Sequence, residues 1–104
     1  RVSPAAVGRT LLVFVEITLA QKSEQIFKKV RDAVQNTPEV LECHLISGSF
    51  DYLVKARLAG MSEYRSLLGS ILQQMPVPAQ SNSYVVMEEV KEGFVLALDR
   101  HRRT

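Results

Sequence analysis

Residues 41–58 read LECHLISGSFDYLVKARL, and this stretch decides the fold because two alternating segments flank a turn. Apolar side chains alternate with Glu42 and His44 in the first segment and with Lys55 and Arg57 in the second. A period of two is typical of a strand with one buried face. Because Ser47-Gly48-Ser49-Phe50-Asp51 lies between the segments and is rich in turn-forming residues, we predict an antiparallel hairpin.

A strand and a helix are predicted on the N-terminal side of the hairpin. The odd positions of residues 10–19 are all apolar and the even positions are mixed, which indicates a strand with one core face and one half-polar face. Ser23 is placed to cap a helix whose apolar positions recur at helical spacing as far as Val34. Pro38 prevents that helix from continuing.

The same order is predicted on the C-terminal side. Apolar residues from Tyr64 to Met75 follow the helical repeat, and Pro76 ends that helix. A strand is expected over residues 83–90, a short fifth strand over residues 94–98, and a solvated tail after them. The order β-α-β-β-α-β predicts an α+β, ferredoxin-like fold, in which two helices cover one face of a four-stranded antiparallel sheet.

The second face of this sheet would remain uncovered. It is expected to be partly apolar at Leu12, Phe14, Val85 and Met87. A partly apolar face without a covering layer favours contact with another copy of the chain. We therefore expect at least a dimer, of the dimeric α+β barrel type.

Composition limits the function classes. The 104 residues are enough for one domain, with 46% hydrophobic and 23% charged residues, near the averages for globular proteins. The apolar run from Leu11 to Val15 is too short to span a membrane. The net charge of +2 resides in Asp99, Arg100, Arg102 and Arg103, so residues 1–98 are neutral and lack the basic surface that nucleic-acid binding needs.

The sequence offers no arrangement for catalysis or metal binding. Cys43 is the single cysteine, which excludes an internal disulfide and a cysteine-based zinc site and favours the reducing cytoplasm. Cys43 and His44 are adjacent on a strand and point to opposite faces, so they cannot share a metal. The same reasoning excludes Glu88 and Glu89 as a catalytic pair. We expect no catalytic residue, no metal and no cofactor.

Several blocks resemble the effector-binding half of the leucine-responsive/asparagine-operon (Lrp/AsnC) family of bacterial transcription regulators, and together they cover about residues 3–92. The most specific is the Ser-Gly-x-x-Asp-Tyr hairpin at residues 47–52, followed by Lys55. The next is Val-Met-Glu-Glu-Val-Lys at residues 86–91. The alternating segment at residues 11–19 and Met-Ser-Glu-Tyr at residues 61–64 fall in the right order with them.

The resemblance implies sheet-paired homodimers that assemble further, often into octamers, with small amino acids bound where dimers meet. It also implies a DNA-reading helix-turn-helix domain that is absent here. Arg1 as the first residue suggests a fragment, although some family members consist of the sensing domain alone. Residues 1–9 would be the linker from that domain, residues 10–98 the effector-binding and oligomerisation domain, and residues 99–104 a basic tail. DNA contact would occur only through the missing domain, and no membrane partner is implied. Gly60 and the loop at residues 76–79 depart from the usual family pattern.

An amino-acid zwitterion needs an acceptor for its ammonium, N–H donors for its carboxylate and an apolar pocket for its side chain. The hairpin offers Gly48, with an accessible backbone N–H, and Asp51, with a carboxylate. Met61, Val85 and Val86 would line the side-chain pocket. The resemblance places Ser83 and Tyr84 at its edge and Ser81 less securely. A simpler interpretation is that Gly48 and Asp51 only form the turn.

Two other functions stay open at the level of sequence. One is a small dimeric α+β barrel enzyme of the monooxygenase kind, which would need a base or haem ligand; His44 and His101 are the only histidines. The other is an amino-acid-sensing regulatory domain of a metabolic enzyme. It differs from the transcription-regulator hypothesis only in what is fused upstream.

Overall fold

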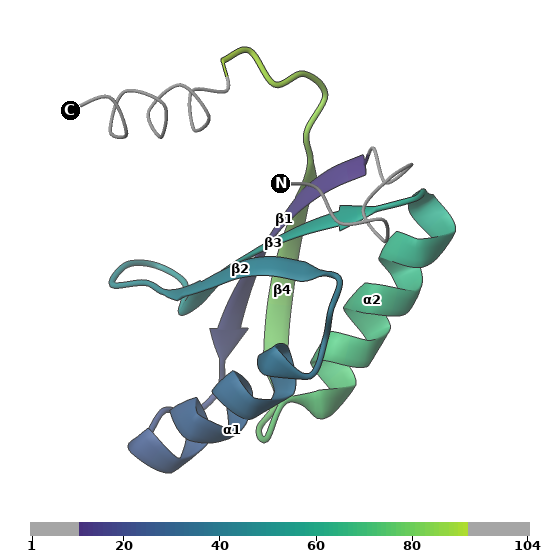
Figure 1. The fold of residues 1–104 in the computed structure, drawn as a ribbon. Coiled ribbons are helices and arrows are strands. Elements are labelled where there is room, and N and C mark those ends of the chain that lie inside the picture. Colours follow the sequence, from purple (N-terminus) through teal and green to yellow (C-terminus); the bar gives the residue numbers. More distant parts are fainter. Residues whose placement is uncertain (1–10, 92–104) are drawn as a thin grey trace, which may run out of the picture.

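The computed structural model describes residues 11–91. Their elements are β1 (Leu11–Leu19), α1 (Glu24–Gln35), β2 (Val40–Leu45), β3 (Tyr52–Leu58), α2 (Met61–Gln74) and β4 (Ala79–Val85). The strands form one antiparallel sheet in the order β2-β3-β1-β4. Both helices lie on the same side of this sheet, and no helix or strand of residues 11–91 covers its other side, which is called the uncovered face (Figure 1). The predicted ferredoxin-like fold is confirmed.

The core lies between the helices and the two central strands. In β1 the odd-numbered residues face the helices, and in β3 the even-numbered residues do so. Val13, Ile17, Val54 and Leu58 are fully buried there. The helices contribute their own buried residues to this cluster, namely Val30, Leu67 and Ile71. The alternation read from the sequence therefore identifies the core face of both central strands.

Local hydrogen bonds fix where the helices begin. The Ser23 hydroxyl accepts from the Ile26 N–H at 3.2 Å, which satisfies one of the unpaired donors of the first turn of α1. Gly60, at the start of α2, has no side chain that could cap the helix. The Glu63 carboxylate instead accepts from the Ala59 N–H at 3.1 Å. Thr37 donates to the Ala33 carbonyl at 3.0 Å just before Pro38. The predicted helix boundaries are confirmed.

The last strand differs from its predicted range of residues 83–90. It starts four residues earlier, at Ala79. Ser81 and Ser83 pair with Ile17 and Val15 of β1, but their small polar side chains show no apolar alternation, so the pattern does not reveal the first part of the strand. It ends at Val85, near the point where β1 begins, after which the Val86 N–H still donates to the Leu12 carbonyl at 2.9 Å. Residues 87–90 are not in a strand.

Two predicted side-chain directions were wrong. Val85 pairs with Val13, so it lies on the helix side of the sheet and not on the uncovered face. In β2, a register shift between Val40 and Glu42 places Val40 and Cys43 toward the helices, while Leu41 falls in the irregularity and is exposed. A bulge of this kind interrupts the period of two, so alternation alone cannot locate it.

The uncovered face combines apolar residues with charges that pair within the chain. Arg57 donates to both carboxylate oxygens of Glu89 at 3.1 Å, and Lys55 lies 3.8 Å from a carboxylate oxygen of Glu42. Leu12 and Phe14, from β1, lie on this same face. The expected linker (residues 1–9), the expected strand over 94–98 and the basic tail (residues 99–104) lie outside the described residues.

Candidate functional site

Asp51 ties the loop between β2 and β3 to the end of β1. Its N–H donates to the Ile17 carbonyl at 2.9 Å, and its Oδ2 accepts from the Leu19 N–H at 2.7 Å. Its Oδ1 faces the Nζ of Lys22 at 3.7 Å, and only 13% of the side chain is exposed. The carboxylate therefore has one oxygen committed to the backbone and the other opposite an exposed cation.

Gly48, in the same loop, has a backbone conformation that residues other than glycine can also adopt. Its φ is not in the left-handed region, and a Cβ built on it would approach the Ile46 Cγ2 at 3.7 Å, an ordinary contact. Nothing among residues 11–91 therefore requires glycine at position 48. Phe50, at the other side of the loop, is partly buried.

Another group of predicted site residues lies around the beginning of β1. Tyr84 pairs with Phe14, Val85 pairs with Val13, and the backbone of Val86 bonds to that of Leu12. Met61 begins α2, three residues after Leu58, which pairs with Leu11. Met61 and Tyr84 are each 51% exposed, whereas Ser83 is partly buried and faces the helix side.

The two groups do not meet within one chain. Asp51 contacts residue 19 at one end of β1, whereas Tyr84 lies opposite residue 14 near the other end. Five residues of an extended strand correspond to roughly 17 Å, which is longer than a small amino acid. Ser81, opposite Ile17, is the nearest of the β4 candidates to the hairpin end. A site that uses Asp51 and Tyr84 together therefore needs two copies of the chain.

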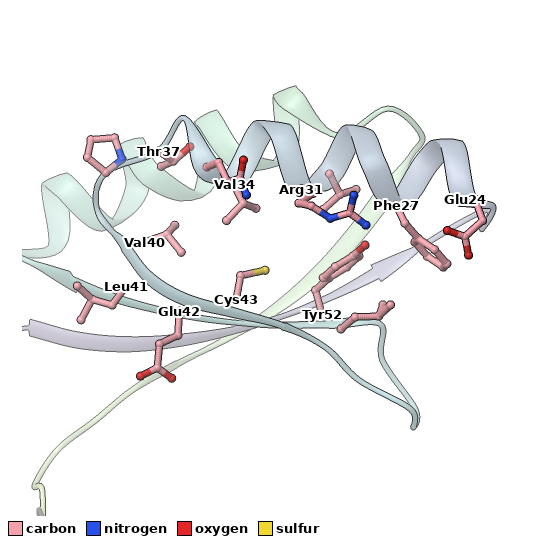
Figure 2. Close-up of a pocket in the computed structure, with 14 residues that line it drawn as sticks. Glu24, Phe27, Arg31, Val34, Thr37, Val40, Leu41, Glu42, Cys43 and Tyr52 are labelled. Carbon is pink, nitrogen blue, oxygen red and sulfur yellow. The ribbon is translucent and has the colours of Figure 1, made fainter. Parts of the chain in front are cut away.

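Two pockets bear on these residues, one beside them and one apart from them. A pocket of about 280 Å³ lies beside the end of β1 and is lined by Thr18, Leu19, Ala20, Pro78, Ala79 and Gln80. Its Leu19 is the residue whose N–H binds Asp51. A larger pocket of about 520 Å³ lies between α1 and β2 and contains none of the predicted site residues. Figure 2 shows this second pocket, with the Arg31 and Tyr52 side chains directed into it.

Sequence reasoning missed the α1–β2 pocket. Arg31 belongs to the polar side of a helix pattern, and Tyr52 and Cys43 belong to the core side of strand patterns. No motif connects them, because the hollow results from how a helix crosses an edge strand. The register shift after Val40 lies beside the pocket, which Val40, Leu41 and Glu42 line, and it leaves no signal in the alternation.

The surroundings of two titratable groups raise their pKa values. The negative charge of Glu16 raises the pKa of the Tyr84 hydroxyl, which donates to Glu16 Oε1 at 3.3 Å. Burial raises the pKa of the Cys43 thiol, so the thiol stays protonated at neutral pH and is a weak nucleophile. Cys43 lies opposite Val54 and His44 opposite Leu53, which confirms that they point to opposite faces.

Within residues 11–91, no group of three or more His, Cys, Asp or Glu side chains is arranged to hold a metal ion. In this same part of the chain, neither helix has the length and apolar character needed to cross a membrane.

Comparison with known proteins identifies the family. Residues 12–96 match the family model of the Lrp/AsnC ligand binding domain. The chain belongs to this family. It is 48% identical over 96 residues to the leucine-responsive regulatory protein of Escherichia coli K12, and 47% identical to that of Haemophilus influenzae. The matched region covers 92% of this chain but 58% of each Lrp relative, so the chain spans little more than half of their length.

Solved structures agree with this assignment. An AsnC family transcriptional regulator from Agrobacterium tumefaciens is 27% identical, with a TM-score of 0.80 over 96% of this chain and 65% of that protein. The transcriptional regulator NMB0573 from Neisseria meningitidis, solved as a complex with L-methionine, is 25% identical, with a TM-score of 0.78 over 97% of this chain and 65% of that protein. These Lrp/AsnC neighbours are transcription regulators, and one of them is an amino-acid complex.

Proposed function

We propose that this chain is the amino-acid-sensing and oligomerisation domain of an Lrp/AsnC-type transcriptional regulator. It binds a small amino acid such as leucine between dimers and thereby controls assembly, and through assembly the regulation of transcription. The match of residues 12–96 to the ligand-binding family is the observation that carries this proposal. DNA is contacted only by a helix-turn-helix domain outside this chain, the protein works in the cytoplasm, and it is not an enzyme.

The proposed site is shared between copies. The hairpin of one copy supplies Gly48 and Asp51, and another copy supplies Met61, Tyr84, Val85 and Val86, with Ser83 beside them. The separation of these two groups within one chain supports a shared site, because one amino acid cannot touch both ends of β1. An effector bound across two copies changes the free energy of assembly by its own binding free energy, which couples sensing to oligomer size.

The sheet face without helices supports the homodimer on which assembly to an octamer builds. A two-fold interface brings the same face of both copies together, so unpaired charges of one sign on that face would repel. Two cations on this face are instead paired within the chain, Arg57 with Glu89 and Lys55 with Glu42, and Glu16 accepts a hydrogen bond from the Tyr84 hydroxyl. Phe14, which is partly buried, provides apolar surface among them, whereas Leu12 on the same face is already buried within this chain.

Calorimetric titration with a panel of amino acids, run alongside light scattering, tests this function. We expect micromolar to millimolar binding of at least one small apolar amino acid and a change in particle mass with its concentration. A single-chain particle that binds no amino acid at high concentration would contradict the proposal.

Gly48→Ala is expected to weaken amino-acid binding by about tenfold or more while the fold keeps its stability. The backbone accepts a Cβ at this position, so the free energy of unfolding should stay the same or rise by up to about 1 kcal/mol. The added methyl group occupies space that a ligand or a neighbouring copy needs. Calorimetry and thermal unfolding measure the two effects. Gly69→Ala, where a Cβ on α2 meets no atom within 4 Å, is the matched control and should bind normally. If Gly48→Ala lowers stability and leaves affinity unchanged, Gly48 serves only the turn.

Lys22→Met is expected to strengthen amino-acid binding by up to about fivefold, because the Lys22 ammonium faces the Asp51 oxygen that the ligand's ammonium would use. Removing an exposed ion pair frees that oxygen at little cost in stability. Lys29→Met on the outside of α1 is the control, since Lys29 has no ion pair among residues 11–91. An affinity that falls in the Lys22 variant would show that Lys22 assists the ligand and does not compete with it.

A further inference from the structure

The pocket between α1 and β2 contains two hydrogen-bond donors without partners. Tyr52 is 94% buried, since its relative exposure is 6%, yet its hydroxyl forms no hydrogen bond within residues 11–91. Arg31 has no ion pair in this part of the chain. Both groups point into the space between helix and strand (Figure 2). The Tyr52 hydroxyl itself reaches the accessible surface of the pocket, because no fully buried side-chain nitrogen or oxygen in this part of the chain lacks a hydrogen-bond partner, and it is therefore free to donate to a ligand.

The walls around these donors are mostly apolar. Phe27 packs edge-on against the Tyr52 ring, with ring centroids 6.3 Å apart, and closes one end. Val34 and Val40 line the opposite part of the pocket, and Cys43 lies on its floor. The volume of about 520 Å³ is within the range of sites for small organic ligands.

Two carboxylates and one guanidinium, those of Glu24, Glu42 and Arg31, line the pocket. Glu42 points away from α1, toward the uncovered face, and is engaged by Lys55 and His44. Glu24 lies at the outer end, beyond Phe27. Arg31 is the only Lys or Arg among the lining residues, and its charge also acts on Tyr52. The interior therefore offers a guanidinium and a hydroxyl to a ligand, and neither has an ion-pair or hydrogen-bond partner among residues 11–91.

We propose that the α1–β2 pocket binds a small organic carboxylate with an apolar body, held by the Arg31 guanidinium and the Tyr52 hydroxyl. The carboxylate accepts from both donors, and the apolar body lies against Phe27, Val34 and Val40. This site is separate from the proposed amino-acid site, because no residue of that site lines the pocket. It also does not require a second copy of the chain.

The protonation of Tyr52 suits this role. Burial is the largest cause that raises the pKa of its hydroxyl, and the nearby Arg31 opposes the rise only in part. The hydroxyl thus stays a neutral donor throughout the physiological pH range, and it never presents a negative charge to the bound carboxylate.

Titration of the 104-residue chain with octanoate, followed by amide NMR shifts and calorimetry, tests the proposal. Octanamide is the matched probe, since it has the same apolar body without the charge. We expect octanoate to bind about tenfold more tightly than octanamide, because hydrogen bonds to a charged group are stronger than neutral ones. The largest shifts should occur in residues 27–43 and at Tyr52.

Two variants locate the binding. Arg31→Gln and Tyr52→Phe should each weaken octanoate binding by about fivefold or more and leave octanamide binding within about twofold. Arg65→Gln, an exposed arginine of α2 that does not line the pocket, is the control and should bind octanoate normally. Arg31 is exposed on α1, so Arg31→Gln is expected to fold. It therefore tests the proposal by itself if Tyr52→Phe does not fold.

Three results overturn the proposal: equal affinity for octanoate and octanamide, unchanged octanoate affinity in Arg31→Gln, or shifts confined to the uncovered sheet face. Absence of octanoate binding together with a change of particle mass in Arg31→Gln also overturns it, and assigns the pocket to contact with another copy of the chain. None of these results depends on whether amino acids bind at the hairpin.

Discussion

Asp51→Ala is expected to abolish the amino-acid response and to lower the free energy of unfolding by about 1–3 kcal/mol. The first effect follows from losing the carboxylate that faces the ligand's ammonium in the proposed site. The second follows from leaving the Leu19 N–H without the acceptor that binds it at 2.7 Å. Calorimetric titration with leucine and methionine measures the first effect, and chemical denaturation measures the second.

Asp51→Asn separates the two roles. An asparagine oxygen can still accept from the Leu19 N–H, so most of the stability should return, but the neutral amide attracts an ammonium group far less. We expect this variant to fold like the original chain and to lose most of its amino-acid affinity. Unchanged affinity in both variants would mean that Asp51 only positions the loop, as the turn-only interpretation holds.

The central part of the fold could be predicted from sequence because its signals are local. Tyr52, Val54, Ala56 and Leu58 alternate with partly exposed residues, and the strand has the predicted bounds. Ser23 before α1 and Pro76 after α2 act on their own helix ends, so their effects do not depend on the rest of the fold.

The edges of the sheet could not be predicted in the same way. β4 is recognised through its pairing with β1, and Ser81 and Ser83 become strand residues only because Ile17 and Val15 lie opposite them. The face of Val85 depends on that register as well. A register is a relation between distant segments, which the period of one segment does not contain.

The candidate site raised a similar difficulty. The residues proposed to bind an amino acid are recognisable as motifs, but their separation along β1 appears only in three dimensions. The Arg31–Tyr52 pocket has no motif at all, because residues from a helix face and from two strands form it.

Phe14→Asp is expected to convert assemblies of this chain into single folded chains. Phe14 lies on the uncovered face, between Lys55 of β3 and Tyr84 of β4, and it is only partly buried within one chain. In an interface that buries position 14, the new carboxylate would lose its contact with water without gaining a partner, which costs several kcal/mol. Sedimentation velocity at micromolar concentration should then show one species of about the chain mass of 11.7 kDa.

Leu41→Asp is the matched control for this loss of assembly. Leu41 is 51% exposed on the irregular edge strand β2, away from the uncovered face, so a carboxylate there should leave assembly unchanged. If Leu41→Asp dissociates the chains and Phe14→Asp does not, the copies meet through the edge of β2. Phe14→Leu, which keeps an apolar side chain, should assemble normally, since the interface requires apolar surface at this position and not an aromatic ring.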